Sequence, residues 1–219
     1  MKIESVDIAQ TSSVASIICE ALKKAIVEGR LKDGEPLRQD EIARMFNTSR
    51  IPVREALTML EQQGLVATQR YKGAIVAGIS PDEAAEIWDF RALVEGHVIE
   101  VAASRMNAET LAEAEAHLSA FARATGPMEW GDWNRRFHMV LYRASGLTYH
   151  LSIIEKTLDR VDRYIRAQLS LSNGLARADA EHREILDACA AGDASRAGAL
   201  TRQHILGAKA NLLANLRAV

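Results

Sequence analysis

The segment from Ser49 to Leu65, SRIPVREALTMLEQQGL, constrains the fold more than any other stretch of the chain. Ser49 is placed to cap a helix, and Pro52 then falls in the first turn, where a missing N–H loses no hydrogen bond. Arg50 and Arg54 lie one turn apart, in the N-terminal half of this helix. They flank one apolar face, which is made of Val53, Ala56, Leu57 and Leu60. Two arginines in this position are typical of a recognition helix, which presents them to phosphates and to guanine in a major groove.

The flanking sequence predicts the other parts of a winged helix-turn-helix. Upstream, apolar residues recur at helical spacing over residues 14–26 and 37–46, and a short polar turn follows at 47–49. Downstream, Gly64 is expected to end the recognition helix. Two short strands are then predicted, with a basic tip between them at residues 70–73; the strands are 65–68 and 74–77.

Four motifs occur in order within residues 10–80: EGRLxxGExL, EIARMFxxSRIPVREAL, LExxGLV and KGAxV. Together they resemble the N-terminal domain of GntR-family bacterial transcription regulators. The resemblance implies contacts to DNA from Arg38, Arg44, Ser49, Arg50, Pro52, Arg54, Lys72 and Gly73. Many relatives carry an arginine where Asp40 stands, so Arg38 or Arg44 is expected to substitute for it. The alternative, an ordinary amphipathic surface helix with solvated arginines, does not account for the turn and the wing.

Composition limits the class of protein. The chain of 219 residues is 48% apolar and 26% charged, which is ordinary globular usage. No apolar run is long enough for a membrane helix and the first five residues contain no signal-peptide core, so we expect a cytoplasmic protein without membrane partners. Cys19 and Cys189 are expected to be reduced core residues. Residues 1–80 contain 11 Lys and Arg against 10 Asp and Glu, so DNA binding would depend on a local basic face.

After Ser80 and Pro81 the sequence is alanine-rich and predicts no strands. Six helical segments are expected, at 82–105, 107–124, 128–145, 148–171, 175–191 and 194–217. The predicted fold class is therefore mainly α, with a winged helix-turn-helix domain over 1–80 and an all-α six-helix bundle over 81–219. A bundle alone does not indicate function, because bundles serve scaffolds, metal enzymes and ligand sensors alike.

Arg91 interrupts an apolar stripe in the first of these segments. The expected stripe consists of Ile87, Phe90, Val94, Val98 and Val101. An arginine within it either forms an ion pair, with Glu95 as the nearest partner, or binds an anion inside a cavity.

Three histidines also lie on apolar helix faces: His138, one turn after Asn134, and His182 and His204 on two later helices. Each alone would more often be a satisfied core histidine than a metal ligand. Together, three imidazoles and an amide oxygen from a bundle interior suit a divalent metal ion.

The segments NRRFH (134–138), EHREIL (181–186), AAGDA (190–194) and RQHI (202–205) resemble the FCD effector domain of the FadR-like branch of the GntR family. The resemblance implies a small organic-acid effector and a divalent metal held by an Asp or Asn and three His, here Asn134, His138, His182 and His204. We expect zinc, with nickel and manganese as alternatives. Asn in place of Asp at 134 removes one negative charge and should weaken metal retention. The remaining histidines match no ligand position and are expected on the surface or in packing: His97, His117 and His150.

Two function classes remain to be compared. One is a ligand-responsive transcription regulator, expected to be a repressor, that binds an inverted-repeat operator in double-stranded DNA as a homodimer and meets its effector at Arg91. The other is a metal-dependent bundle enzyme, a hydrolase or lyase, fused to a DNA-binding module. No motif such as HExxH places a general base beside the histidines, so the sequence favours the regulator and not an enzyme. A constitutive architectural DNA binder would leave the inward Arg91 and the three histidines unexplained.

Overall fold

The computed structural model describes residues 13–170 and 174–216. The chain divides into two compact units, Met1–Gly78 and Ile79–Val219, and this division falls two residues before the expected boundary at 80/81. Residues 1–12 lie outside the described part, as do the predicted helix ends at 171 and 217.

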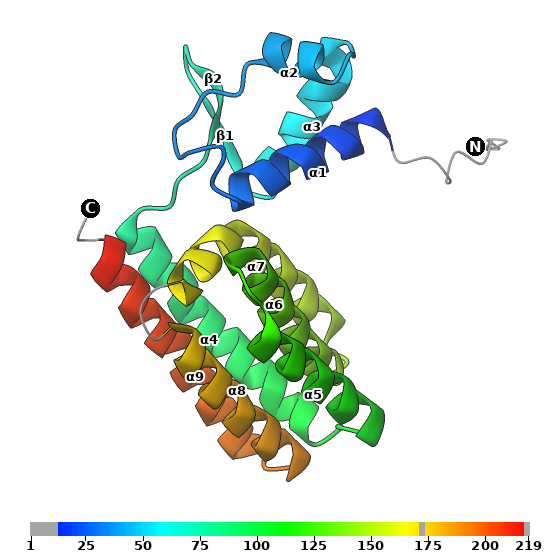
Figure 1. Cartoon of the computed structure of the whole chain (residues 1–219), viewed down its shortest axis with the longest axis vertical. Helices are drawn as coiled ribbons and strands as arrows, with labels where there is room; N and C mark the ends of the chain where they lie inside the picture. Colours follow the sequence, from blue (N-terminus) through cyan, green and yellow to red (C-terminus); the bar gives the residue numbers. More distant parts are fainter. Residues whose placement is uncertain (1–12, 171–173, 217–219) are drawn as a thin grey trace, which may run out of the picture. The chain divides into compact units, whose positions relative to one another are not determined.

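The first unit packs three helices around one small core (Figure 1). They are α1 (Val14–Val27), α2 (Gln39–Met45) and α3 (Arg50–Gln62). Ser13 starts α1, because its hydroxyl accepts the N–H of Ser16. The apolar faces of α1 and α3 meet, and Ile18 and Leu60 are completely buried between them. Burial of each such side chain stabilises the fold by about 1.5–3 kcal/mol.

Two residues with positive φ set the ends of α3. Asn47, in the turn before it, has φ 47°, a conformation that asparagine tolerates better than most residues. Gly64 has φ 72°, and the N–H of Leu65 reaches back to the carbonyl of Leu60 at 2.9 Å. The predicted turn and the predicted helix stop are therefore both present.

The wing consists of β1 (Val66–Gln69) and β2 (Gly73–Val76), which pair in antiparallel register with Val66 opposite Val76. The stretch between α1 and α2 adds a third extended segment. The Leu37 N–H donates to the carbonyl of Ala74 at 2.8 Å, and the Val76 N–H donates to Glu35 at 2.9 Å. The free edge of β2 is thereby covered.

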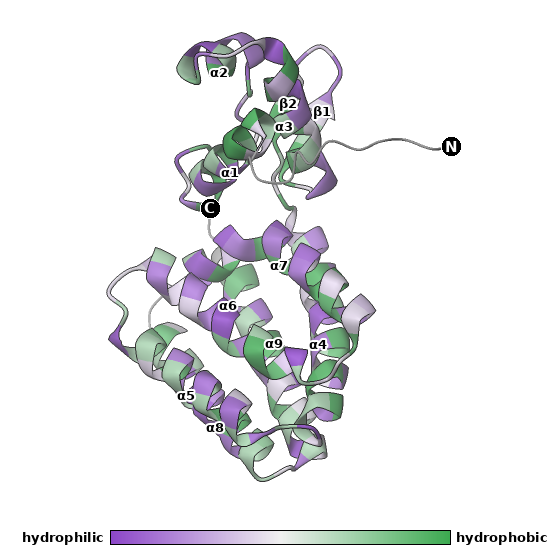
Figure 2. Cartoon of the chain, turned by 90° about the vertical axis from the view of Figure 1, so that its right-hand side faces the viewer, coloured by the Kyte–Doolittle hydropathy of each residue, from purple (hydrophilic) through white to green (hydrophobic). Residues whose placement is uncertain are grey.

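Six helices make up the described part of the second unit, which confirms the predicted winged helix-turn-helix and helical-bundle fold class. They are α4 (Pro81–Ala103), α5 (Ala108–Arg123), α6 (Pro127–Arg143), α7 (Thr148–Leu169), α8 (Gly174–Ala190) and α9 (Ala194–Leu216). Ser80 caps α4 by accepting the N–H of Glu83. α9 runs beside α4 (Figure 1), and each helix carries both hydrophobic and hydrophilic residues (Figure 2).

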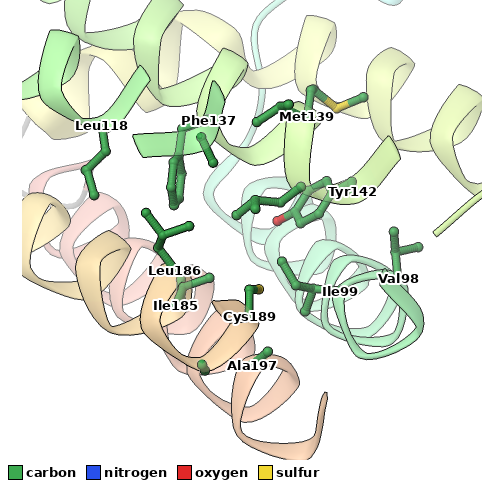
Figure 3. Packing of buried hydrophobic residues seen from close by; sticks show 14 of the residues in the cluster. Val98, Ile99, Leu118, Phe137, Met139, Tyr142, Ile185, Leu186, Cys189 and Ala197 are labelled. Atoms are coloured by element: carbon green, nitrogen blue, oxygen red, sulfur yellow. The ribbon is translucent and has the colours of Figure 1, made fainter. Parts of the chain in front are cut away.

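The bundle core is built from side chains of several helices. Phe137 of α6 points towards Ile185 of α8, while Tyr142 of α6 lies near Ile99 of α4 (Figure 3). Phe137, Ile185 and Tyr142 have no exposed surface. Both cysteines are free and buried, as expected.

The buried face of α4 differs from the predicted stripe. Phe90 is 42% exposed, whereas Trp88 is 1% exposed and occupies the inward position. The face that packs inward contains Ala84, Trp88, Arg91, Ala92, Glu95, Val98, Ile99 and Ala102. The stripe was misplaced because α4 carries apolar residues on both faces, so periodicity alone does not identify the inner one. Arg91 nevertheless lies inside, at 6% exposure.

Candidate DNA-binding surface and metal centre

The N-terminal half of α3 presents two exposed arginines, Arg50 and Arg54, from its first two turns. Ser49 has extended N-cap geometry, but its hydroxyl makes no capping hydrogen bond, so that part of the prediction was wrong. The first N–H groups of α3 therefore receive no bond from this side chain. Pro52 lies in the first turn of the helix.

Acidic residues of α2 pair with the basic groups around this helix start. The Arg50 guanidinium contacts the Asp40 carboxylate, and both side chains are exposed. Arg38 pairs with Glu41 at 3.2 Å, and Arg44 donates to the backbone carbonyl of Asp40 at 3.3 Å. Asp40, at the position where many relatives carry an arginine, thus lies beside Arg50.

The wing tip is basic and exposed. Tyr71, with φ 68°, is 91% exposed, and the Arg70 guanidinium carbon lies 5.0 Å from the centre of its ring. Lys72 is exposed next to Tyr71, and Gly73 begins β2 with φ 73°. The tip therefore offers two cations on a short loop.

In the second unit, three imidazoles meet inside the bundle. They belong to His138 on α6, His182 on α8 and His204 on α9, and one nitrogen of each ring lies within 4.8 Å of the others. The Nε2 atoms of His138 and His182 are 3.1 Å apart. Two ligands at about 2.0–2.1 Å from a tetrahedral zinc ion are separated by about 3.3 Å, so this spacing fits a shared ion.

Burial keeps these imidazoles in the form that a metal requires. His138 and His182 are 4% and 0% exposed, and desolvation lowers the pKa of each well below its ordinary value, with a further lowering from neighbouring His204. Both rings are therefore neutral at physiological pH. Neutral imidazole is the form that binds divalent metals.

Asn134, the predicted fourth ligand, is buried one turn before His138 on α6. The three other histidines lie elsewhere. His97 and His150 pack against each other with ring centres 5.8 Å apart, and His117 lies 3.4 Å from a carboxylate oxygen of Glu113.

Arg91 forms the ion pair that was one of its two predicted roles. Its Nε donates to Glu95 Oε1 at 2.7 Å, and Glu95 is only 1% exposed. The second oxygen of Glu95 accepts the hydroxyl of Tyr142 at 2.9 Å, and the same hydroxyl oxygen lies 3.3 Å from Nδ1 of His138. Burial, followed by the charge of Glu95, raises the pKa of Tyr142 well above its ordinary value, so the phenol stays protonated.

His204 has a carboxylate partner that the sequence analysis missed. Its Nδ1 lies 2.6 Å from Oε2 of Glu181, and the other oxygen of Glu181 is 3.5 Å from Nε of Arg177. Glu181 and His204 are 23 residues apart, on different helices. In the sequence, Glu181 stands out only because it follows Arg177 by four residues, as Glu95 follows Arg91.

Two family models match the chain. The model for bacterial regulatory proteins of the gntR family matches residues 15–76, and the model for the FCD domain matches residues 86–207. The chain belongs to the GntR family. The HTH-type transcriptional repressor GlaR of Escherichia coli K12 is 30% identical over 196 residues, which cover 84% of this chain and 89% of GlaR.

Two solved structures share the fold. Escherichia coli McbR/YncC superimposes with a TM-score of 0.75 at 22% identity, covering 95% of this chain and 99% of that one. A GntR regulator from Rhodococcus sp. RHA1 gives a TM-score of 0.74 at 23% identity, covering 93% and 99%.

The proteins similar to this GntR-family member are transcription regulators and not enzymes. FCD domains often bind metal ions, and the three-histidine cluster here has the geometry to hold one. In the described part of the chain, no helix combines the length and apolar character needed to cross a membrane.

Proposed function

We propose that this GntR-family regulator is a repressor that binds a short inverted-repeat operator as a homodimer, in the cytoplasm, and responds to a small organic acid. The observation that carries the proposal is the presence, in one chain, of a winged helix with exposed arginines and a cluster of three imidazoles, of which His138 and His182 are buried and neutral. The name of GlaR as a repressor supports the direction of control.

On DNA, α3 enters the major groove and the wing tip contacts the backbone. Arg50 and Arg54 are the base-reading candidates, because guanidinium forks match the guanine edge. Lys72 contacts a phosphate and therefore adds affinity without sequence preference. The full set of residues proposed to contact DNA is Arg38, Arg44, Ser49, Arg50, Pro52, Arg54, Lys72 and Gly73.

The homodimer is proposed to form through α4 and α7 of the helical unit. Large apolar side chains are exposed on both helices: Leu93 at 69% on α4 and Tyr149 at 75% on α7. A groove between these helices is lined by Glu86 from α4 and Lys156 from α7, among other residues. A two-fold partner can pair such opposite charges reciprocally, because the same surface is used twice.

In the helical unit, Asn134, His138, His182 and His204 are proposed to hold the metal ion. Zinc is the preferred ion, because it favours nitrogen ligands and four-fold coordination; nickel and manganese are the alternatives. A bound ion would supply positive charge for the carboxylate of an organic acid inside the bundle.

Arg91 is proposed as a second contact for the acid. Glu95 already balances its charge, so the metal supplies most of the attraction and Arg91 contributes its remaining N–H groups. Buried polar atoms of the helical unit without a hydrogen-bond partner include Nε1 of Trp88, Nε2 of Gln168 and Oγ1 of Thr201. Such atoms are costly when unpaired, and a polar ligand inside the bundle would reduce that cost.

The experiment begins with selection of duplexes from a random pool by the full chain, followed by anisotropy titrations at fixed salt. Arg54→Ala is expected to lose about 1–3 kcal/mol of affinity for the selected duplex, since one base-reading fork is removed. The matched control is Arg196→Ala, an exposed arginine of α9. Enrichment of no duplex, or equal affinity of both variants for it, would contradict the recognition-helix assignment.

The sensor is tested by metal analysis and by linkage. Protein purified without chelator is expected to carry zinc or to take it up, whereas the His182→Ala variant is expected not to retain zinc. A wild-type content below about 0.2 ions per chain, after zinc, nickel or manganese has been supplied, would remove the metal site from the proposal. Zinc-loaded protein is then screened against small carboxylic acids by thermal shift. An acid at 100 times its Kd should add about 2.7 kcal/mol of stability. Binding of the acid must change the affinity of the protein for the operator, and binding of the operator must change the affinity of the protein for the acid by the same factor.

A further inference from the structure

Only one nitrogen of each imidazole can face a shared metal ion, and in a neutral ring that nitrogen must not carry the proton. His138 and His204 each have a hydrogen-bond partner at Nδ1. The chemistry of these partners decides which nitrogen of each ring is protonated.

At His204 the partner is a carboxylate. An ionised carboxylate only accepts hydrogen bonds, so the 2.6 Å contact with Glu181 requires the proton to be on Nδ1 of His204. When this ring binds a metal ion as a neutral imidazole, Nε2 is therefore the nitrogen that has the free lone pair.

At His138 the same conclusion follows through Tyr142. Its hydroxyl has a single hydrogen, which it donates to the Glu95 carboxylate at 2.9 Å. The hydroxyl oxygen can therefore only accept from Nδ1 of His138, at 3.3 Å. His138 then also carries its proton on Nδ1, and its bare Nε2 is the atom that faces His182.

Each carboxylate is held by an arginine four residues before it. Arg91 pairs with Glu95 on α4, and Arg177 pairs with Glu181 on α8. The arginine supplies a positive charge next to the carboxylate that contacts the imidazole.

His182 lacks such a partner, because its buried Nδ1 has no hydrogen bond. Its Nε2 lies 3.1 Å from the bare Nε2 of His138 and must donate to it in the metal-free chain. To bind a metal ion through Nε2, this ring has to move its proton to Nδ1. Two of the three ligands are therefore prepared in advance, and the third is not.

We propose that Glu181 and the Tyr142–Glu95 pair are positioning residues that keep His204 and His138 protonated on Nδ1, so that both rings offer Nε2 to the metal ion. This inference rests on the metal site of the proposed function. Outer partners of metal-binding histidines typically change metal affinity by about 10- to 100-fold when they are removed.

Two measurements on the full chain test this. Long-range proton–nitrogen NMR correlations of metal-free protein in EDTA identify the protonated nitrogen of each ring, and competition with a zinc-binding dye gives the zinc Kd. Tyr142→Phe removes the partner of His138, and Glu181→Met removes the partner of His204. Each variant is expected to weaken zinc binding by about 10- to 100-fold. In each, the histidine that has lost its partner should also populate the tautomer protonated on Nε2. Glu181→Gln keeps an acceptor oxygen and should preserve the Nδ1–H form of His204.

The matched controls are Tyr149→Phe and Glu184→Met, which change the same residue types at exposed positions of α7 and α8. Both should bind zinc as the wild type does. The inference would be overturned if the zinc Kd of Tyr142→Phe and of Glu181→Met lay within twofold of the Kd of these controls. It would also be overturned if His138 or His204 of the wild type proved to be protonated on Nε2. If the wild type binds no zinc, the metal proposal fails, whereas the NMR measurement still decides the tautomer assignment. Glu181 is partly exposed, so its variants are expected to fold even if Tyr142→Phe does not.

Discussion

Arg91→Met should destabilise the helical unit strongly, because it leaves a buried carboxylate without its cation. Glu95 is 1% exposed and would lose the contacts from the guanidinium at 2.7 and 3.5 Å, keeping only the Tyr142 hydroxyl at 2.9 Å. Removing one partner of a buried ion pair typically costs about 3–5 kcal/mol. Methionine fills most of the volume of the aliphatic stem, so lost packing adds little.

The assay uses tryptophan fluorescence during urea unfolding. The three tryptophans, Trp88, Trp130 and Trp133, all belong to the second unit, so their signal follows that unit alone. With a slope of about 2 kcal/mol per molar urea, a loss of 3–5 kcal/mol lowers the midpoint by about 1.5–2.5 M. EDTA is present throughout, because metal binding to the folded chain would itself change the midpoint.

Two further variants separate charge from packing. Arg91→Met combined with Glu95→Met removes both charges and should recover most of the lost stability, since apolar replacement of a buried pair is often neutral or favourable. Lys209→Met, which breaks an ion pair with the 54%-exposed Asp89, should cost less than about 1 kcal/mol. The reasoning fails if Arg91→Met unfolds at the wild-type midpoint, or if the double variant is as unstable as the single one.

Four other predictions concern DNA, assembly and thiol chemistry. On random duplex, which offers Arg50 no operator guanine, Asp40→Asn should free Arg50 to neutralise one phosphate. Non-specific affinity then rises and the slope of log K against log salt steepens by about 0.9 per protomer; an unchanged slope in salt titrations would contradict this. Lys72→Ala should weaken binding to the operator and to random duplex equally in anisotropy titrations, and a selective loss would instead indicate base reading. Light scattering should give twice 24.0 kDa for the wild type and 24.0 kDa for Leu93→Asp, whereas a dimeric variant would place the interface elsewhere. Burial raises the pKa of Cys189 to about 12 and also raises that of Cys19, so mass spectrometry should show little alkylation of either thiol at pH 8 until urea unfolds the chain.

The elements of this fold could be predicted because their signals are local. The first turn with Pro52 and the left-handed Gly64 mark the limits of α3 in sequence as they do in space. Three histidines on apolar faces could likewise be expected inside, because helical periodicity determines which residues share a face.

What could not be predicted depends on the partner surface. α4 offers Trp88 on one face and Leu93 on another, and only packing against α9 and the other helices determines which face is buried. Glu181 immediately precedes His182 in sequence but bonds to His204 on a different helix. Such a contact follows from how two helices are placed, and no spacing rule within one helix reveals it.

The three imidazoles come from α6, α8 and α9, so the cluster cannot exist until α9 has docked along α4. A nascent chain that still lacks α9 would have only two of the rings, and a chain with α9 misplaced would have them apart. Retention of an ion by this cluster would therefore report that synthesis and docking of the helices are finished. The proposed sensing would in this way be restricted to molecules whose bundle is already complete.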